Sequence, residues 1–400
     1  MRAAEVGWEV IGLDTDAVRV ESLALGVSFV DDVTDDQLAA ARANGRYTAS
    51  TDYNACTNFD VAVVTVPTPL KDGNPDLSYV EQACRSLSRL LRPGTLVVLE
   101  STTYPGTTRD LVGPLLGEGS GLVPGADFHL GYSPERIDPG NTTWTLVTTP
   151  KVVSGIDEES LRAVRRFYDP IVDRTVAVRS PLEAEFCKLL ENTFRHVNIA
   201  LVNELAMFAR GLDIDIWDTI DAASTKPFGY MRFTPGPGVG GHCLPIDPSY
   251  LSWQIKRSLG HAFRFVELAN DVNDHMPDYI TRRAAAMLND AELAVNGSRI
   301  LLLGLAYKRN SGDARESPAV RVGELLGGMG AHLRGADPHI QGSMPVGITR
   351  AQVTAEEVQA ADLVIVLTDH DAFPFAVVDQ HARRVLDCRR VPALRSATRL

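Results

Sequence analysis

The sequence predicts an α/β protein built from two doubly wound domains, which are joined by a long central helix and a helical middle region. Two observations predict this fold. Apolar runs of strand length alternate with helical stretches near both ends of the chain, as in parallel sheets that are buried on both faces. Between them, about 30 residues from Pro181 onward contain no helix breaker. We expect domains at residues 1–180, 181–294 and 295–400.

The first domain is predicted from apolar runs between Trp8 and about Ser180. They read WEVIGLD, FDVAVVTV, GTLVVLEST, KVVSGI and TVAVRS. The segment RAAEVG ahead of them reads as the last turn of a helix, with Gly7 as its cap. Ligands of such sheets bind at the carboxyl ends of the strands, so the loops after these runs should hold the functional residues.

The long helix has signals at both ends. Ser180 and Glu183 form a capping box, and Pro181 takes the first helical position. Gly211 is placed to end the helix. Its length is on the order of 45 Å, which is typical of a helix that spans between domains or forms an interface between subunits.

The rest of the chain is mostly helical to about residue 294 and then returns to the α/β pattern. The helical part is interrupted by KPFGYMRFTPGPGVGGHCLPIDPSYL. The last domain is predicted from the runs RILLLGLAYK, AHLRGAD and ADLVIVLTD.

Composition excludes several classes of function. No apolar run approaches the roughly 18 residues of a membrane span, and the first segment is too short and polar for a secretory signal, so we expect a cytoplasmic protein. The net charge of −12 argues against nucleic acid and acidic membranes as partners. The cysteines are scattered without C-x-x-C spacing, which favours neither disulfides nor a metal site. They are Cys56, Cys84, Cys187, Cys243 and Cys388.

The loop FTPGPGVGGHCLPIDP, residues 233–248, is rich in glycine and proline. Such backbone bends tightly and lets a ligand come close. Cys243 lies at its centre and Asp247 follows four residues later. The loop is either a ligand site with an accessible thiol or a structural turn whose cysteine is incidental.

Lys188 and Asn192 lie four residues apart on the long helix. This spacing puts an ammonium and an amide on one face, where both could donate to an oxyanion. The alternative is an ordinary solvated lysine.

Four further motifs follow predicted strands. They are VPTP at 66–69, ESTTYPGTT with Thr102, SPERIDPGN with Glu135, and GLAYKRNSGDARESP with Lys308, Arg309 and Arg315. Hydroxyls, a carboxylate and cations at strand ends suit a cofactor, a base and phosphate oxygens, respectively. Each motif also has a plain structural reading, as a helix cap or a surface loop.

Taken in order, these motifs resemble the UDP-glucose/GDP-mannose dehydrogenase family of nucleotide-sugar 6-dehydrogenases. The resemblance covers essentially the whole chain, and GGHCLPIDP is its most specific part. It implies an NAD-binding Rossmann-like domain, a central domain with the catalytic loop, and a C-terminal Rossmann-like domain for the nucleotide sugar. Separately, we expect the long helix to mediate a homodimer, since a helix of that length often forms an interface between subunits.

The resemblance implies a reaction in which the C6 alcohol of the sugar is oxidised twice, each time with transfer of a hydride to NAD. The thiolate of Cys243 would add to the aldehyde, and the resulting thioester would be hydrolysed to the acid. The remaining catalytic residues would be Lys188, Asn192, Asp247, Glu135 and Thr102.

Binding residues follow from the same resemblance. NAD would contact Asp14, whose charge disfavours a 2′-phosphate, and also Arg19, Thr65, Pro67, Thr68, Thr102 and Arg315. The nucleotide sugar would contact Glu135, Lys188, Asn192, Arg232, Phe233, Gly236, Gly238, Gly240 and Lys308. The substrate would be UDP-glucose or a UDP-N-acetylhexosamine, and the SPER.DPGN form is shared with enzymes that act on N-acetylated sugars.

The sequence departs from the family pattern at its start. The strand and the G-x-G-x-x-G loop that would precede Gly7 are absent from it, so we expect weak NAD binding and an exposed sheet edge. The alternative function is a catalytically impaired homologue with a structural or dimerising role. A plain hydroxyacid dehydrogenase is a third reading, but such an enzyme needs no cysteine.

Overall fold

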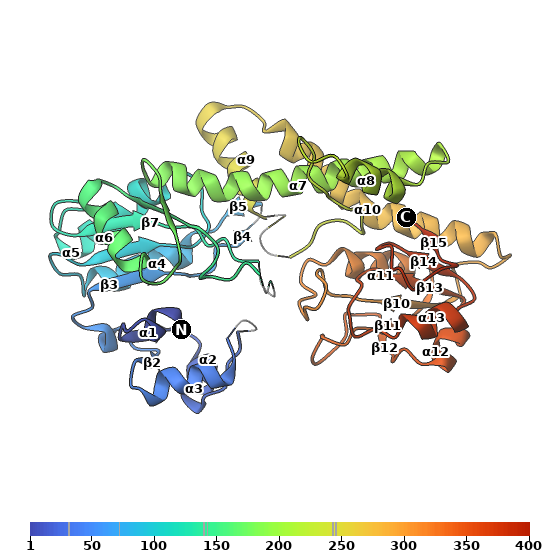
Figure 1. Cartoon of the computed structure of the whole chain (residues 1–400), viewed down its shortest axis with the longest axis horizontal. Helices are drawn as coiled ribbons and strands as arrows, with labels where there is room; N and C mark the ends of the chain where they lie inside the picture. Colours follow the sequence, from blue (N-terminus) through green and yellow to red (C-terminus); the bar gives the residue numbers. More distant parts are fainter. Residues whose placement is uncertain (31–32, 72, 139–140, 142, 242–243, 245) are drawn as a thin grey trace. The chain divides into compact units, whose positions relative to one another are not determined.

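The computed structural model describes residues 1–30, 33–71, 73–138, 141, 143–241, 244 and 246–400 (Figure 1). These residues form two compact units, Met1–Glu191 and Asn192–Leu400. Helix α7 (Pro181–Gly211) contributes residues to both units. Among the helices within these ranges, none is both long and apolar enough to cross a membrane.

The first unit contains two sheets of parallel or mostly parallel strands. In the smaller one, β1 (Val10–Leu13) pairs in parallel with β2 (Tyr47–Ser50). The larger sheet has the order β3-β6-β7-β8-β9. Its strands are β3 (Val61–Val64), β6 (Leu96–Leu99), β7 (His129–Tyr132), β8 (Lys151–Gly155) and β9 (Thr175–Ala177). A short antiparallel hairpin consists of β4 (Leu70–Lys71) and β5 (Asn74–Pro75).

The prediction of a wholly parallel first sheet is wrong at one place. Strand β8 runs antiparallel to β7, with Gly131 opposite Gly155. A parallel neighbour needs a crossover connection, usually a helix. The described residues between β7 and β8 form turns and loop, so the chain returns in the opposite direction.

The two sheets of the first unit each have an open edge. Among the described residues, β1 pairs with β2 alone and β3 pairs with β6 alone. Ile11 of β1 is 39 % exposed, although it is an apolar residue in a strand. One edge of β1 and one edge of β3 are therefore without a strand partner among the described residues.

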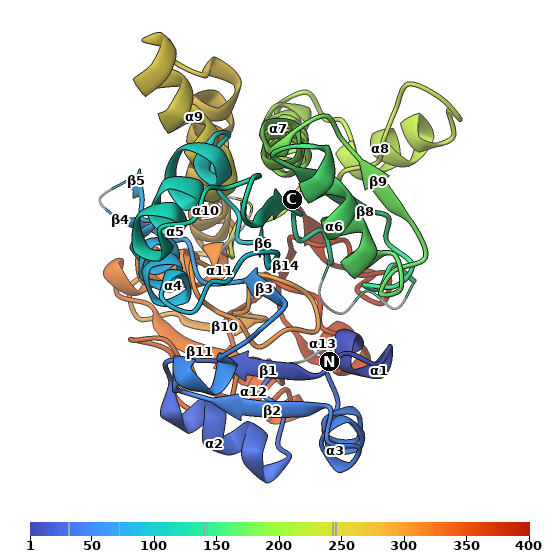
Figure 2. The ribbon, with the colours of Figure 1, turned by 90° about the vertical axis from the view of Figure 1, so that its left-hand side faces the viewer.

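Helices cover the larger sheet of the first unit on both faces. On one face lie α1 (Arg2–Glu5) and α6 (Glu158–Tyr168), and the Trp8 ring packs 5.5 Å from that of Phe167. On the other face lie α4 (Ser78–Ser88) and α5 (Gly113–Ser120). A π-helical turn, η2 (Thr108–Val112), precedes α5. Beside β1 and β2 lie α2 (Ala17–Leu25) and α3 (Asp35–Ala43) (Figure 2). A short 3₁₀ segment, η1 (Tyr53–Cys56), follows β2.

The predicted signal at the start of α7 is confirmed. The backbone N–H of Leu182 donates to Ser180 Oγ, and Ser180 Oγ–H donates to the Glu183 carboxylate. The helix begins at Pro181 and its last helical residue is Gly211, as the sequence predicts. Gly211 is not the left-handed cap, however, because that conformation is taken by Asp213, whose φ is +56°.

The second unit combines helices with a six-stranded parallel sheet. Its first helices are α8 (Ile216–Ser224), α9 (Ile246–Leu259) and α10 (Arg264–Asn289). The sheet has the order β12-β11-β10-β13-β14-β15. Its strands are β10 (Arg299–Leu303), β11 (His332–Ala336), β12 (Thr349–Arg350), β13 (Leu363–Val366), β14 (Val385–Asp387) and β15 (Thr398–Arg399). The helices between them are α11 (Pro318–Gly328), α12 (Ala355–Ala360) and α13 (Phe375–His381).

Strand β10 lies in the middle of this sheet and is buried on both faces. Ile300 and Leu302 pack with residues of α10 and α11, whereas Leu301 and Leu303 pack with residues of α12 and α13. This arrangement confirms a doubly wound domain at the C-terminal end. The chain leaves β10 toward β11 on one side, and β13 lies on the other, so the end of β10 is a point where the strand order reverses.

Candidate functional site

Two predicted cofactor loops lie together at the carboxyl edge of the first unit's larger sheet. The loop after β3 carries Thr65, Pro67 and Thr68, and the loop after β6 carries Thr102. Ser101 Oγ–H donates to the carbonyl of Val66 at 2.7 Å and ties the two loops together. The structure therefore brings four of the predicted NAD contacts to one edge.

A buried carboxylate holds the loop after β6 in place. Glu185 on α7 accepts hydrogen bonds from the backbone N–H groups of Gly106 (2.6 Å) and Thr108 (2.8 Å) and from the Thr108 hydroxyl (2.6 Å). Burial raises the pKa of Glu185 from 4.5 to about 7, although these hydrogen bonds act in the opposite direction. Since the folded-state pKa is the higher one, ionisation of Glu185 opposes folding as the pH rises between these two values.

Asp14 and Arg19, both predicted to contact NAD, form an ion pair after β1. Arg19 Nη1 lies 3.4 Å from Asp14 Oδ2. Asp14 Oδ1 also accepts the N–H of Asp16, which in turn caps the start of α2. The acid therefore lies at a strand's carboxyl end, next to a helix N-terminus, as in sites that hold a ribose.

Glu135 follows β7 in a segment that other residues hold in place. Its Oε1 accepts the N–H of Ile137 at 2.6 Å. Arg136 donates to both carboxylate oxygens of Glu191, at 3.2 and 2.5 Å, and to the carbonyl of Pro150 at 2.6 Å. Glu135 itself is partly exposed.

A buried ion pair lies beneath this segment. Lys151 is 4 % exposed, and its Nζ lies 2.7 Å from Glu100 Oε1 and 3.2 Å from the carbonyl of Pro134. The Tyr168 hydroxyl donates to Glu100 at 2.5 Å, and the Tyr168 ring lies 5.1 Å from the Lys151 ammonium. Burial and the neighbouring Glu100 carboxylate raise the pKa of Tyr168 well above its usual value. The phenol therefore stays protonated and acts as a donor.

The polar residues predicted on α7 are buried. Lys188 is 9 % exposed and Asn192 is 6 % exposed, so the reading of Lys188 as an ordinary solvated lysine is wrong. Asn192 Nδ2 donates to Asp247 Oδ2 at 2.5 Å, and Asp247 is 3 % exposed. Two predicted catalytic residues of the second unit are thus in direct contact.

Two asparagines hold the glycine-rich loop. Asn203 on α7 accepts the N–H of Gly236 at 2.9 Å and donates to Asn273 on α10, also at 2.9 Å. A Cβ at Gly238, where φ is +124°, would lie 2.8 Å from the carbonyl oxygen of Asn273. Because this position needs both a left-handed backbone and no side chain, only glycine fits it.

The same loop packs against the loop that follows β10. A Cβ at Gly240 would lie 2.5 Å from the carbonyl oxygen of Glu316 and 2.8 Å from Pro318 Cδ, and one at Gly241 would lie 2.7 Å from the Tyr307 ring. Two motifs about 70 residues apart in sequence, GPGVGG and GLAYKRNSGDARESP, therefore form one surface within the second unit.

The other residues of the second unit that are predicted to bind a ligand are Phe233, Arg232, Arg315 and Lys308. Phe233 packs edge-on against Phe194, with ring centroids 5.8 Å apart. Arg232 pairs with Asp221, which Arg390 also contacts. Arg315 donates to both carboxylate oxygens of Asp313, at 2.9 and 2.7 Å, and Lys308 lies partly exposed in the loop after β10.

Cys243 lies outside the described residues, so its predicted role stays a prediction. Among the described parts of the chain, no group of three or more histidine, cysteine or acidic side chains is placed to hold a metal ion.

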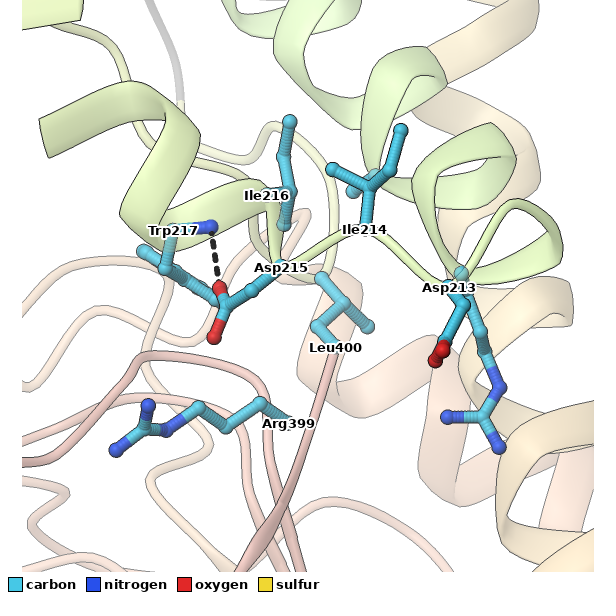
Figure 3. Close-up of a pocket in the computed structure, with 9 residues that line it drawn as sticks. Asp213, Ile214, Asp215, Ile216, Trp217, Arg399 and Leu400 are labelled. Atoms are coloured by element: carbon cyan, nitrogen blue, oxygen red, sulfur yellow. Dashed lines mark hydrogen bonds between the residues drawn. The ribbon is translucent and has the colours of Figure 1, made fainter. Parts of the chain in front are cut away.

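A cavity of about 280 Å³ lies at the C-terminal end of α7 (Figure 3). It is lined by Asp213, Asp215, Trp217, Arg399 and Leu400, among others, and the Trp217 backbone N–H donates to Asp215 Oδ1 at 2.8 Å. None of its lining residues belongs to the motifs that the sequence singled out.

Several residues that hold the loops of the candidate site are not among those predicted from the sequence. Asn203 lies eleven positions after Asn192, a spacing that puts both on one face of α7. The spacing is visible in the sequence and predicts that the two amides share that face. Asp337 and His370 follow β11 and β13, where the strand-end rule already pointed. Arg389 follows β14, and its Nη1 would lie 2.4 Å from a Cβ at Gly236.

Three family models match successive parts of the chain. They are the UDP-glucose/GDP-mannose dehydrogenase family NAD binding domain at residues 1–172, the central domain at 182–275 and the UDP binding domain at 301–393.

Similar proteins agree with these matches. The UDP-N-acetyl-D-mannosamine dehydrogenase of Pyrococcus horikoshii is 32 % identical over 92 % of this chain and 86 % of its own length. Protein CapL of Staphylococcus aureus is 38 % identical over 80 % of this chain and 74 % of its own length. The solved structure of a UDP-glucose dehydrogenase from Pyrobaculum islandicum superposes with a TM-score of 0.88 at 28 % identity, covering 99 % of this chain and 92 % of that one.

Proposed function

Since the chain belongs to the UDP-glucose/GDP-mannose dehydrogenase family, we propose that it oxidises the C6 hydroxyl of a nucleotide-diphospho-sugar to a carboxylate, with NAD as hydride acceptor. The observation that carries this proposal is the burial of Lys188 and of the hydrogen-bonded pair Asn192 and Asp247. Buried polar groups of this kind cost folding free energy unless they are paired, and they cluster at sites with a chemical role.

Two oxidations in one site need a nucleophile, and we assign this role to Cys243. Its thiolate adds to the C6 aldehyde that the first oxidation leaves, forming a thiohemiacetal. Loss of the second hydride gives a thioester, and water then displaces the thiolate and releases the carboxylic acid. Two molecules of NAD, one for each oxidation, would accept the hydrides.

The other polar residues act on oxygen and water. Lys188 and Asn192 donate to the oxygen on which negative charge develops. Asp247, held by Asn192, orients the water that takes the proton of the C6 hydroxyl. Glu135 activates the water that hydrolyses the thioester.

The described residues fit NAD at the edge of the first unit. Asp14 offers a carboxylate to ribose hydroxyls and disfavours a 2′-phosphate. Hydroxyls and backbone at the ends of β3 and β6 face the same edge, with Ser101 joining the loops. The proposed contacts are Asp14, Arg19, Thr65, Pro67, Thr68, Thr102 and Arg315.

We assign the nucleotide sugar to the surface formed by the glycine-rich loop and the loop after β10. Lys308 supplies a cation for the diphosphate. The sugar and nucleotide contacts proposed with it are Glu135, Lys188, Asn192, Arg232, Phe233, Gly236, Gly238 and Gly240. We propose that the functional division follows the expected boundaries of 180/181 and 294/295, with NAD held mainly by the first part, apart from Arg315, and the nucleotide held by the last.

The sugar we favour is a UDP-N-acetylhexosamine. Relatives at 32 and 33 % identity are named as dehydrogenases of UDP-N-acetyl-D-mannosamine and of an N-acetyl-D-galactosaminuronic acid nucleotide. UDP-glucose is the second candidate, since a structure named as a UDP-glucose dehydrogenase superposes with a TM-score of 0.88, against 0.87 for one named as a UDP-D-ManNAc dehydrogenase. In either case the product is a uronic acid suited to polysaccharide synthesis in the cytoplasm.

The substrate is tested by measuring NADH formation with UDP-glucose, UDP-N-acetylglucosamine, UDP-N-acetylmannosamine and GDP-mannose. We expect the largest kcat/KM with one of the two N-acetylated sugars. An optimum with UDP-glucose would transfer the assignment to the second candidate, and NADH formation with none of the four would contradict the proposed function.

We also propose that the chain forms a homodimer through α7. One face of this helix exposes large apolar side chains at the spacing of a packing surface. They are Leu190, Phe194, Leu201, Leu205 and Phe208, which are between 44 and 57 % exposed. A second copy is the occupant that this face fits, because a continuous apolar stripe on a long helix is self-complementary about a two-fold axis.

A double substitution, Leu201→Asp with Leu205→Asp, is expected to turn the dimer into a monomer at micromolar concentration, because charges would be buried in an apolar contact. Sedimentation velocity measures the mass. Val346→Asp, at an isolated residue that is 97 % exposed, is the matched control and should remain dimeric. A wild-type protein that sediments as a monomer would refute the dimer.

A further inference from the structure

His370 lies where three strands of the second unit's sheet end. Strand β10 runs between β11 and β13, and Asp337 and His370 follow these two neighbours. Their side chains meet over the end of β10, with His370 Nε2 3.0 Å from Asp337 Oδ2, and neither side chain is exposed to solvent. The loop that carries Lys308 leaves β10 beneath this contact.

The first residues of that loop are fastened to the same side chains. Asp337 Oδ2 accepts the backbone N–H groups of Leu305 (2.8 Å) and Ala306 (3.0 Å). Thr368 donates to the carbonyl of Ala306 at 2.7 Å. Asp337 Oδ1 accepts two further N–H groups after β11. Burial alone would raise the pKa of Asp337, but the hydrogen bond from His370, together with those from backbone N–H groups, lowers it to about 2. The carboxylate is thus fixed in its ionised form.

The far side of the loop is fastened at Asn310. The backbone N–H of Asn310 donates to His370 Nδ1 at 2.9 Å. The Asn310 side chain exchanges hydrogen bonds with Asp371, at 2.6 and 3.0 Å. Tyr307, Lys308 and Arg309 therefore lie between two fixed points, and their backbone has little freedom left.

These contacts determine the tautomer of His370. Nδ1 accepts an N–H, so it carries no proton, and the proton of the neutral ring is on Nε2, where it is donated to Asp337. The ring also packs edge-on against Phe373, with centroids 5.4 Å apart, which fixes its plane.

We propose that His370 is a positioning residue for nucleotide-sugar binding: its neutral ring holds the Asn310 backbone relative to Asp337 and thereby sets where Lys308 meets the diphosphate. This inference rests on the proposed function for the identity of the ligand. The role is one of placement, since His370 is fully buried and lies behind the loop rather than on its surface.

The two ring nitrogens can be tested separately. In His370→Asn, Oδ1 occupies the place of Nδ1 and can still accept the Asn310 N–H, whereas the donor to Asp337 is lost. In His370→Gln, a side-chain N–H at the place of Nε2 can still donate to Asp337, whereas the acceptor for Asn310 is lost. His370→Phe keeps an aromatic ring at this position but loses both hydrogen bonds.

Binding of uridine diphosphate to the full chain, measured by calorimetry, gives a readout that needs neither NAD nor turnover. We expect Kd to rise about tenfold in His370→Gln and His370→Phe and less than about threefold in His370→Asn, because one hydrogen bond to the loop is worth about a factor of ten. His332→Asn and His332→Phe, at an exposed residue of β11, are the matched controls and should leave Kd unchanged.

Amide hydrogen exchange supplies a second measurement that does not depend on the ligand. We expect faster exchange in the segment 305–311 of His370→Gln and His370→Phe, with β10 and β13 unchanged. Wild-type affinity and wild-type exchange in His370→Phe would overturn the inference, as would equal effects of the Asn and Gln variants. If instead the wild-type chain fails to bind uridine diphosphate while exchange in 305–311 responds as expected, then the proposed ligand is wrong and the fastening of the loop by His370 stands.

Discussion

A Cys243→Ala variant is expected to lose production of the carboxylate by on the order of 10³-fold or more, because no other group in the proposed scheme can form the thioester. The aldehyde would then have no covalent route to the second hydride transfer. The first oxidation does not need the thiol, so a limited formation of NADH, at most one per sugar, is expected to remain. Product analysis by mass spectrometry distinguishes the aldehyde from the acid.

Two further cysteine variants make this result specific. Cys243→Ser keeps a weaker nucleophile, and we expect carboxylate formation between that of the wild type and that of the alanine variant. Cys56→Ala changes a buried cysteine of the first unit and should retain turnover. Full carboxylate production by Cys243→Ala would refute the covalent mechanism.

Lys151→Met is expected to lower the free energy of unfolding by about 3–5 kcal/mol, the largest effect on stability that we predict. In the wild type the Lys151 ammonium lies 2.7 Å from the Glu100 carboxylate. The substitution leaves this carboxylate buried, with the Tyr168 hydroxyl but without a cation. It also removes the hydrogen bond to the Pro134 carbonyl, which supports the segment that carries Glu135. Urea denaturation followed by circular dichroism measures the change.

An exposed ion pair provides the control for this prediction. Arg85→Met breaks a contact to Glu81 at 3.3 Å in which the arginine is largely exposed, and it should cost less than about 0.5 kcal/mol. Adding Glu100→Gln to Lys151→Met should recover part of the loss, because the uncompensated charge is then gone. A loss below about 1 kcal/mol in Lys151→Met would show that the pair is not needed for stability.

Much of the fold is readable from local sequence. The short apolar runs at residues 96–99, 151–155, 299–303 and 363–366 are all strands. Strands of a sheet that is buried on both faces are apolar along their whole length, which is the pattern seen in these runs. The start of α7 follows from Ser180 and Glu183 in the same way, whereas its left-handed cap lies at Asp213 and not at the predicted glycine. The antiparallel direction of β8 could not be predicted, because it depends on the connection from β7, which contains no helix. The residues of β8 itself are the same whichever way the strand runs.

The candidate site shows a similar division. The i, i+4 spacing of Lys188 and Asn192 predicts a shared helix face, but their burial and the contact of Asn192 with Asp247 depend on residues far apart in sequence. The Lys151, Glu100 and Tyr168 cluster is a tertiary contact among three separate elements. Asp337 and His370 each follow a strand, but only the order of strands in the sheet brings them together over β10.

The ratio of NADH formed to sugar consumed tests the central claim most directly. With limiting nucleotide sugar and excess NAD, the proposed four-electron oxidation predicts two NADH per sugar and a product that carries a C6 carboxylate. One NADH per sugar, with an aldehyde or ketone as the product, would contradict it.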